Sequence, residues 1–195
     1  MKYIVYSVLF ITLLSCNKKE ENKPIQKIEK EYIDDPLVYE VINAVLEMPE
    51  ITEDNPEYLL NFANPFLFDL GMEGEDFYFH AEKYFGKIDT VLINNQIKES
   101  RYSFYQKDKI NNIEVIDYNF IYAITNNKLD SLNQSIKKFK PNISVSFPIF
   151  NKDKNVAFIS YYYDCGFLCG IGKQMFLKKV GNQWKVLIVF NEIIS

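Results

Sequence analysis

Four strand-length segments near the C-terminus carry the clearest hydrophobic pattern in the chain. They are rich in β-branched and aromatic residues and span residues 143–150, 156–164, 173–180 and 183–190. A polar turn at residues 151–155 follows the first segment. Gly181-Asn182, which precedes the last, suits a two-residue hairpin turn with glycine first. The pattern therefore predicts an antiparallel β-meander.

The second of these segments is apolar or aromatic on both faces. Tyr161 and Tyr163 share one face with Ala157 and Ile159, whereas Phe158 lies on the other. A sheet with one face in water alternates more cleanly, so we expect helices on one face and a pocket, a partner surface or a second layer of core on the other. Tyr161 and Tyr163 are candidate ligand-contacting aromatics, because tyrosine presents both a ring and a hydroxyl group. The alternative is that they complete the core.

Helical spacing of apolar positions marks the first half of the chain. Residues 35–48 place apolar side chains along one helix face, with Asp35 as the cap and Pro36 in the first turn. Asn55-Pro56 predicts a second short helix over residues 55–63. The domain should therefore begin with two helices.

Later segments give weaker patterns. Residues 75–85 predict a helix that Gly86 ends, and residues 88–97 fit a helix or a strand. Three further short elements are expected: a strand at 113–116, a strand or helix at 120–124 and a helix at 128–139.

Together these elements predict an α+β fold in which N-terminal helices pack on a C-terminal antiparallel meander. The chain has 195 residues, of which 48% are hydrophobic, so it can bury one domain core. We assign residues 35–195 to that single domain. A cystatin-like or NTF2-like arrangement, with a helix across a curved sheet, is the fold analogy, and such sheets serve both enzymes and binding proteins.

The N-terminal stretch MKYIVYSVLFITLLSC predicts the compartment. Lys2 precedes an apolar run over residues 3–14, which is shorter than the ~20 residues of a membrane-spanning helix. Ser15-Cys16 has the form of a lipobox, in which a peptidase cuts before a lipid-modified cysteine. We expect residues 1–15 to be a lipoprotein signal peptide and Cys16 to carry the lipid. The alternative is an uncleaved N-terminal membrane anchor.

A lipid on Cys16 makes the membrane the expected partner. Residues 16–34 would form the lipidated cysteine and a flexible charged tether, because residues 17–31 hold little that can be buried. Acyl chains contribute about 0.8 kcal/mol per buried CH₂, which suffices for durable anchoring. The expected location is the bacterial cell envelope, on the periplasmic face or the outer surface of the outer membrane. A formal net charge of −4 argues against a nucleic-acid partner.

Cys165 and Cys169 lie between the second and third predicted strands. Outside the cytoplasm a disulfide is the default, although the pair can close only if the chain turns between them. Gly166 and Gly170 make a turn plausible. Unpaired buried thiols remain an alternative. Thiol chemistry is a weaker one, because the spacing is Cys-x3-Cys and no cationic residue flanks the pair.

No catalytic, cofactor or metal motif stands out along the chain. There is no nucleophile elbow, zinc-protease motif, phosphate loop or dinucleotide fingerprint, so no cofactor or metal ion is expected. His80 is the one histidine, and its aromatic neighbours favour a packing role over that of a base or ligand. Numerous carboxylates keep a carboxylate-dependent hydrolase open, for example Asp69, Glu73, Glu75, Asp76 and Asp164.

The last quarter of the chain resembles a set of uncharacterised Bacteroidetes lipoproteins. The resemblance rests on the Phe-Asn-Lys-Asp-Lys turn from Phe150, the Cys-Gly-x-x-Cys-Gly loop from Cys165, the Trp-Lys-Val strand from Trp184 and the terminal Ile194-Ser195. It implies a family of envelope lipoproteins and no particular activity.

Three functions fit these patterns. The first is a non-enzymatic, lipid-anchored domain that binds a protein or small ligand in the cell envelope. The second is an envelope hydrolase that uses carboxylates in an NTF2-like pocket. The third is an immunity-type protein that neutralises a toxin, since small acidic lipoproteins suit that role.

Overall fold

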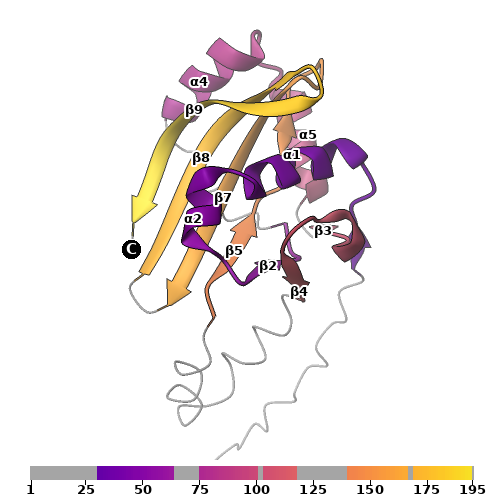
Figure 1. Ribbon diagram of the computed structural model, residues 1–195. Coiled ribbons are helices and arrows are strands. Elements are labelled where there is room, and N and C mark those ends of the chain that lie inside the picture. Colours follow the sequence, from indigo (N-terminus) through magenta and orange to yellow (C-terminus); the bar gives the residue numbers. More distant parts are fainter. Residues whose placement is uncertain (1–29, 64–74, 101–102, 118–139, 167–168, 195) are drawn as a thin grey trace, which may run out of the picture.

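The computed structural model describes residues 30–63, 75–100, 103–117, 140–166 and 169–194 (Figure 1). Its helices are α1 (Pro36–Leu46), α2 (Pro49–Asp54), α4 (Glu75–Phe85), α5 (Thr90–Ser100) and the 3-10 helix η1 (Lys107–Lys109). Its strands are β1 (Glu31–Tyr32), β2 (Tyr58–Leu60), β3 (Ser103–Phe104), β4 (Glu114–Ile116), β5 (Asn142–Val145), β6 (Ile149–Phe150), β7 (Val156–Gly166), β8 (Cys169–Val180) and β9 (Gln183–Ile194). The α+β class is confirmed. The elements expected at residues 120–124 and 128–139 lie outside the described residues.

The last three of the four predicted segments form strands β7, β8 and β9, each antiparallel to the next. The first predicted segment, residues 143–150, is divided into β5 and β6, which both pair antiparallel with β7. Gly181 closes the β8–β9 turn with a φ of 63°, a conformation that glycine adopts without steric cost. Among the described strands β9 is the last of the sheet, and two register shifts along it leave Leu187 and Phe190 as bulged residues.

The other half of the sheet is mixed. Strand β5 runs antiparallel to β7, and β2 lies parallel to both β5 and β4. The helix expected over residues 55–63 is therefore wrong at Tyr58–Leu60. Asn55, with a φ of 49°, caps the C-terminus of α2, so Asn55-Pro56 ends a helix instead of starting one.

Helices cover both faces of the sheet. Ala157, Ile159 and Tyr161 of β7 pack with buried residues of α1 and α2 on the first face. Phe158 packs with α4 and α5 residues on the second face. Figure 1 shows α1 and α2 across the near side of the strands, with α4 and α5 on the far side. The second face thus carries a second layer of core where the helices reach it.

Local caps explain where α1 and α5 begin. The Asp35 carboxylate accepts a hydrogen bond from the Leu37 amide at 2.9 Å, and Pro36 occupies the first turn of α1. In α5, the Asp89 carboxylate accepts from the Leu92 amide at 3.0 Å. This cap favours a helix over residues 88–97, where the apolar pattern fits either a helix or a strand.

Replacing the α1 cap should have a measurable cost. We expect Asp35→Ala to lower the free energy of unfolding by about 1 kcal/mol, because the Leu37 amide loses its acceptor. Urea denaturation measures the change. Asp153→Ala is the matched control, since Asp153 is exposed and has no ion pair or hydrogen bond with the described residues. Equal stability of the two variants would contradict the capping role.

Candidate functional site

The last residues of the expected tether are docked onto the domain. Strand β1 pairs in parallel with β3, and the Ile33 amide donates to the Phe104 carbonyl at 2.9 Å. Ile33 is buried in the first-face core. The Lys30 ammonium pairs with Asp117 and lies 5.3 Å from the centre of the Phe104 ring. Residues 30–34 therefore belong with the folded domain.

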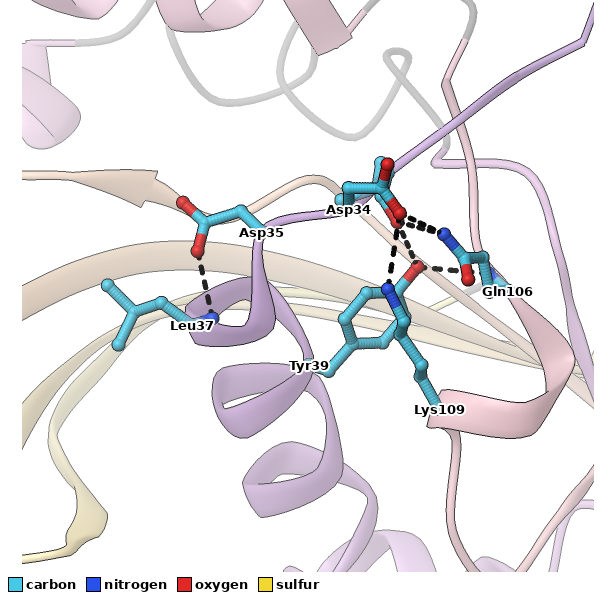
Figure 2. Close-up of polar contacts among 7 residues, drawn as sticks. Asp34, Asp35, Leu37, Tyr39, Gln106 and Lys109 are labelled. Atoms are coloured by element: carbon cyan, nitrogen blue, oxygen red, sulfur yellow. Dashed lines mark hydrogen bonds and ion pairs between the residues drawn. The ribbon is translucent and has the colours of Figure 1, made fainter.

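A polar network fixes this docked segment at the start of α1, as Figure 2 shows. The Asp34 carboxylate accepts hydrogen bonds from Gln106 Nε2 at 2.6 Å and from Lys109 Nζ at 3.3 Å. The buried Tyr39 hydroxyl donates to the Ile33 carbonyl at 2.7 Å and accepts from the backbone N–H of Gln106 at 3.0 Å. Segments far apart in sequence are thus held together.

The Gln106 side chain lowers the pKa of Asp34 by hydrogen bonding to its carboxylate, and Lys109 lowers it further. A carboxyl group with a lowered folded-state pKa stabilises the docked segment above its unfolded-state pKa of about 3.9. That contribution is lost as the pH falls through the lower, folded-state pKa. Docking of residues 30–34 should therefore weaken in acid.

An NMR titration of the Asp34 carboxyl carbon tests this network. We expect Gln106→Ala to raise the pKa of Asp34 toward its ordinary value. The substitution removes the hydrogen bond that lowers this pKa most. Lys154→Ala is the control, since Lys154 pairs with Asp35 at 3.2 Å and not with Asp34. An unchanged Asp34 pKa in Gln106→Ala would refute the assignment.

An open depression lies directly beside the docked segment. Its volume is about 450 Å³, and it is lined by Tyr32, Asn61, Gln106, Lys107, Asp108 and Asp117. The Tyr32 side chain is 49% exposed, and its ring centre lies 6.3 Å from that of Phe104. By contrast, Asn61 is only 2% exposed. The depression therefore combines one accessible aromatic ring with amide and charged groups.

Two of the charged groups in this depression keep their bonding capacity. Neither the Lys107 nor the Asp108 side chain has a hydrogen bond or ion pair with a residue that the structure describes. By contrast, the Asp117 carboxylate is paired with Lys30. Lys107 and Asp108 can therefore each contact a ligand without breaking an existing ion pair.

A second polar feature crosses three strands near the β7–β8 hairpin. Tyr58, Asn142 and Asp164 are register partners on β2, β5 and β7, and Asn142 hydrogen-bonds both neighbours. Burial raises the pKa of Asp164, while hydrogen bonds from the Gly166 amide and Asn142 oppose that rise. The next residue, Cys165, is joined to Cys169 by a disulfide with a Cα–Cα distance of 5.2 Å.

The candidate aromatics of β7 lie beneath helix α2. Tyr161 is only 1% exposed, and burial raises the pKa of its hydroxyl group. Tyr163 is also buried, and its hydroxyl donates to the Asp54 carbonyl at 2.9 Å. Tyr161 and Tyr163 therefore do not present an open face to a ligand, and their burial favours the alternative that they complete the core.

Of the other sequence candidates, His80 is the one whose side-chain surroundings the structure describes in full. His80 packs in α4 against aromatic rings, 4.8 Å from Phe190 and 6.1 Å from Tyr84 between ring centres. Its buried Nδ1 has no hydrogen-bond partner in the described part of the chain. Asp69 and Glu73 lie outside the described residues, as does Cys16. Glu75 and Asp76 form the first turn of α4, far along the chain from Asp164.

The described residues contain neither a metal-binding cluster nor a membrane-spanning helix. No three or more histidine, cysteine, aspartate or glutamate residues among them are grouped so that they could hold a metal ion. Within the same ranges, no helix has the length and apolar character needed to cross a membrane.

Sequence reasoning did not identify the depression. Its lining comes from β1, the end of β2, the η1 region and the residue after β4, and these segments share no motif. Only the fold brings them together. No protein-family model matches the chain, and comparisons with curated proteins and with solved structures also give no match.

Proposed function

We propose that this chain is a lipid-anchored protein of the bacterial cell envelope whose domain binds a ligand in the depression beside its N-terminal segment. The anchor is supported by Lys2, the short apolar run and Cys16. The resemblance of the last quarter of the chain to Bacteroidetes lipoproteins supports the same compartment.

The depression is the observation that carries the binding function. Its volume of about 450 Å³ falls within the range of small-molecule sites. One wall is the docked segment, which the Asp34 and Tyr39 hydrogen bonds hold in place. A wall that is ordered before binding lowers the entropic cost of holding a ligand.

We also propose a cystatin-like or NTF2-like arrangement for the domain. Helix α1 crosses the first face of the meander, with Val41, Ile42 and Val45 buried against it, which supports this analogy. Both arrangements place binding functions on a similar framework, so the fold does not select the ligand.

Membrane fractionation tests the anchor. We expect the chain expressed in a Gram-negative host to sediment with the membranes and to incorporate labelled palmitate, whereas Cys16→Ala should do neither. Cys165→Ala is a matched control, because it changes a cysteine outside the proposed lipobox. Palmitate incorporation by Cys16→Ala would contradict lipidation at this residue.

Ligand-observed NMR tests the binding function. Soluble saccharide and peptide fragments of a bacterial envelope are added to the purified lipidated chain in nanodiscs, and saturation transfer to each fraction is measured. We expect transfer to one fraction that is lost in Tyr32→Ala and kept in Tyr78→Ala, an exposed tyrosine outside the depression. Transfer that does not depend on Tyr32 would argue against this site.

A carboxylate-dependent hydrolase is the second candidate function. The observation that favours it is the raised pKa of Asp164, which is partly buried beside Asn142. Its raised pKa is the property that a general acid needs, and Asn142 orients the carboxyl group. Under this function Asp164→Asn should abolish hydrolysis of envelope glycans while leaving the fold intact. Equal rates for both proteins would exclude Asp164 from catalysis.

A further inference from the structure

We propose that the depression beside β1 is a binding site for a neutral saccharide. This inference rests on the proposed binding function and names the chemical class of its ligand. It is carried by the juxtaposition of the exposed Tyr32 ring with the Gln106 side chain and with Lys107 and Asp108, two adjacent side chains of opposite charge.

The Tyr32 ring supplies the apolar part of the site. The face of an aromatic ring is electron-rich, so it attracts the polarised C–H groups on the flat face of a sugar ring. The pairing of β1 with β3 and the contact with Phe104 hold Tyr32 in position. Phe62 in turn packs against Phe104, with ring centres 5.4 Å apart. An exposed ring on an ordered support can stack with little loss of side-chain freedom.

The Gln106 side chain supplies an uncharged polar group. Gln106 is fixed by hydrogen bonds from its Nε2 to the Ile33 carbonyl and to Asp34. Its Oε1 makes no hydrogen bond with a described residue, so this oxygen can accept from a sugar hydroxyl while Nε2 keeps its two bonds. Asn61 is buried beneath the depression, where its backbone is held by hydrogen bonds to Ile116 and Tyr105.

The charges of the depression favour a neutral ligand over an anion or a cation. Lys107 and Asp108 are adjacent and of opposite sign, and Asp117 is balanced by Lys30. With Lys30 counted beside Asp117, the charges at the depression sum to zero, so none is left over to offset the desolvation of a phosphate, a carboxylate or an ammonium group. Lys107 can still donate to a hydroxyl oxygen, and Asp108 can accept from a hydroxyl group.

Saturation-transfer NMR with N,N′-diacetylchitobiose and the full lipidated chain in nanodiscs tests this inference. We expect transfer concentrated on the sugar-ring C–H protons, with a dissociation constant raised at least tenfold by Tyr32→Ala. Tyr78→Ala is the matched control and should leave the constant unchanged, because Tyr78 is 46% exposed and lies on α4. A constant that Tyr32→Ala does not change would overturn the proposal.

Two additions separate failure of the ligand class from failure of the site. Lys107→Ala should also weaken chitobiose binding, whereas Lys152→Ala, an exposed lysine before β7, should not; this pair keeps the test valid if Tyr32→Ala is poorly folded. Glucose 6-phosphate and a neutral tripeptide are titrated in parallel. Tighter binding of either one at Tyr32 would overturn the neutral saccharide and leave the binding function standing. No Tyr32-dependent binding of any probe or envelope fraction would overturn both.

Discussion

Phe77→Ala is expected to lower the free energy of unfolding by about 3–5 kcal/mol, since it removes a fully buried ring from a packed core. Phe77 lies on α4, and its ring centre is 4.9 Å from that of Phe158 and 6.2 Å from that of Phe176. Both partners belong to the second face of the sheet. The substitution therefore leaves a cavity between the helix and the strands.

Chemical denaturation monitored by circular dichroism measures this loss. The matched control is Phe79→Ala on the same helix, because Phe79 is 65% exposed. Its replacement should change the stability by no more than about 0.5 kcal/mol, as is usual for surface positions. Similar losses in the two variants would mean that α4 does not pack on the sheet through Phe77.

Tyr39→Phe should lower the free energy of unfolding by about 1–3 kcal/mol and loosen the docked N-terminal segment. The substitution keeps the ring but removes the hydroxyl that accepts from the Gln106 amide and donates to the Ile33 carbonyl. The Ile33 carbonyl still accepts from Gln106 Nε2, whereas the Gln106 amide loses its side-chain acceptor. The Gln106 amide is partly buried, so leaving it without a partner carries part of the desolvation cost of an unpaired donor.

Hydrogen exchange locates the effect of Tyr39→Phe. The amides of Ile33 and Gln106 should exchange faster, while amides in β8 should keep their relative protection. Tyr78→Phe serves as the control, because it removes an exposed hydroxyl from another helix. If Tyr39→Phe matched this control in both stability and exchange, the network would not be what holds the segment.

The parts of the fold that were predictable are those specified by local chemistry. Asp35 and Pro36 determine the start of α1 through a cap and a fixed φ, and both act within one helical turn. The meander is likewise built from neighbouring segments, with Gly181 at a tight turn. Such signals need no knowledge of the rest of the chain.

Strand β2 shows where local patterns stop being informative. Tyr58 pairs with Glu114 on one side and Asn142 on the other, so its conformation depends on residues more than fifty positions away. Three apolar residues after Asn55-Pro56 look like the start of a helix when read alone. Tertiary pairing overrides such a weak local preference.

The candidate site was the least predictable feature for the same reason. Sequence reasoning selected Tyr161 and Tyr163, because strand alternation is visible locally, but it does not tell which face a helix will cover. Tyr32 carries no motif, and it becomes notable only because β3 places it beside Gln106 and Asn61. The assignment of residues 1–15 and Cys16 remains a prediction from the N-terminal pattern.

The bulges of β9 affect how copies of this protein behave at high concentration. A regular edge strand of this length, with exposed side chains such as Val186 and Val189, is a template for pairing with another strand. Leu187 and Phe190 interrupt the regular spacing of its backbone hydrogen-bonding groups and increase its twist. A second chain that approached β9 would therefore meet an irregular ladder, so these two extra residues disfavour edge-to-edge pairing at the last described strand.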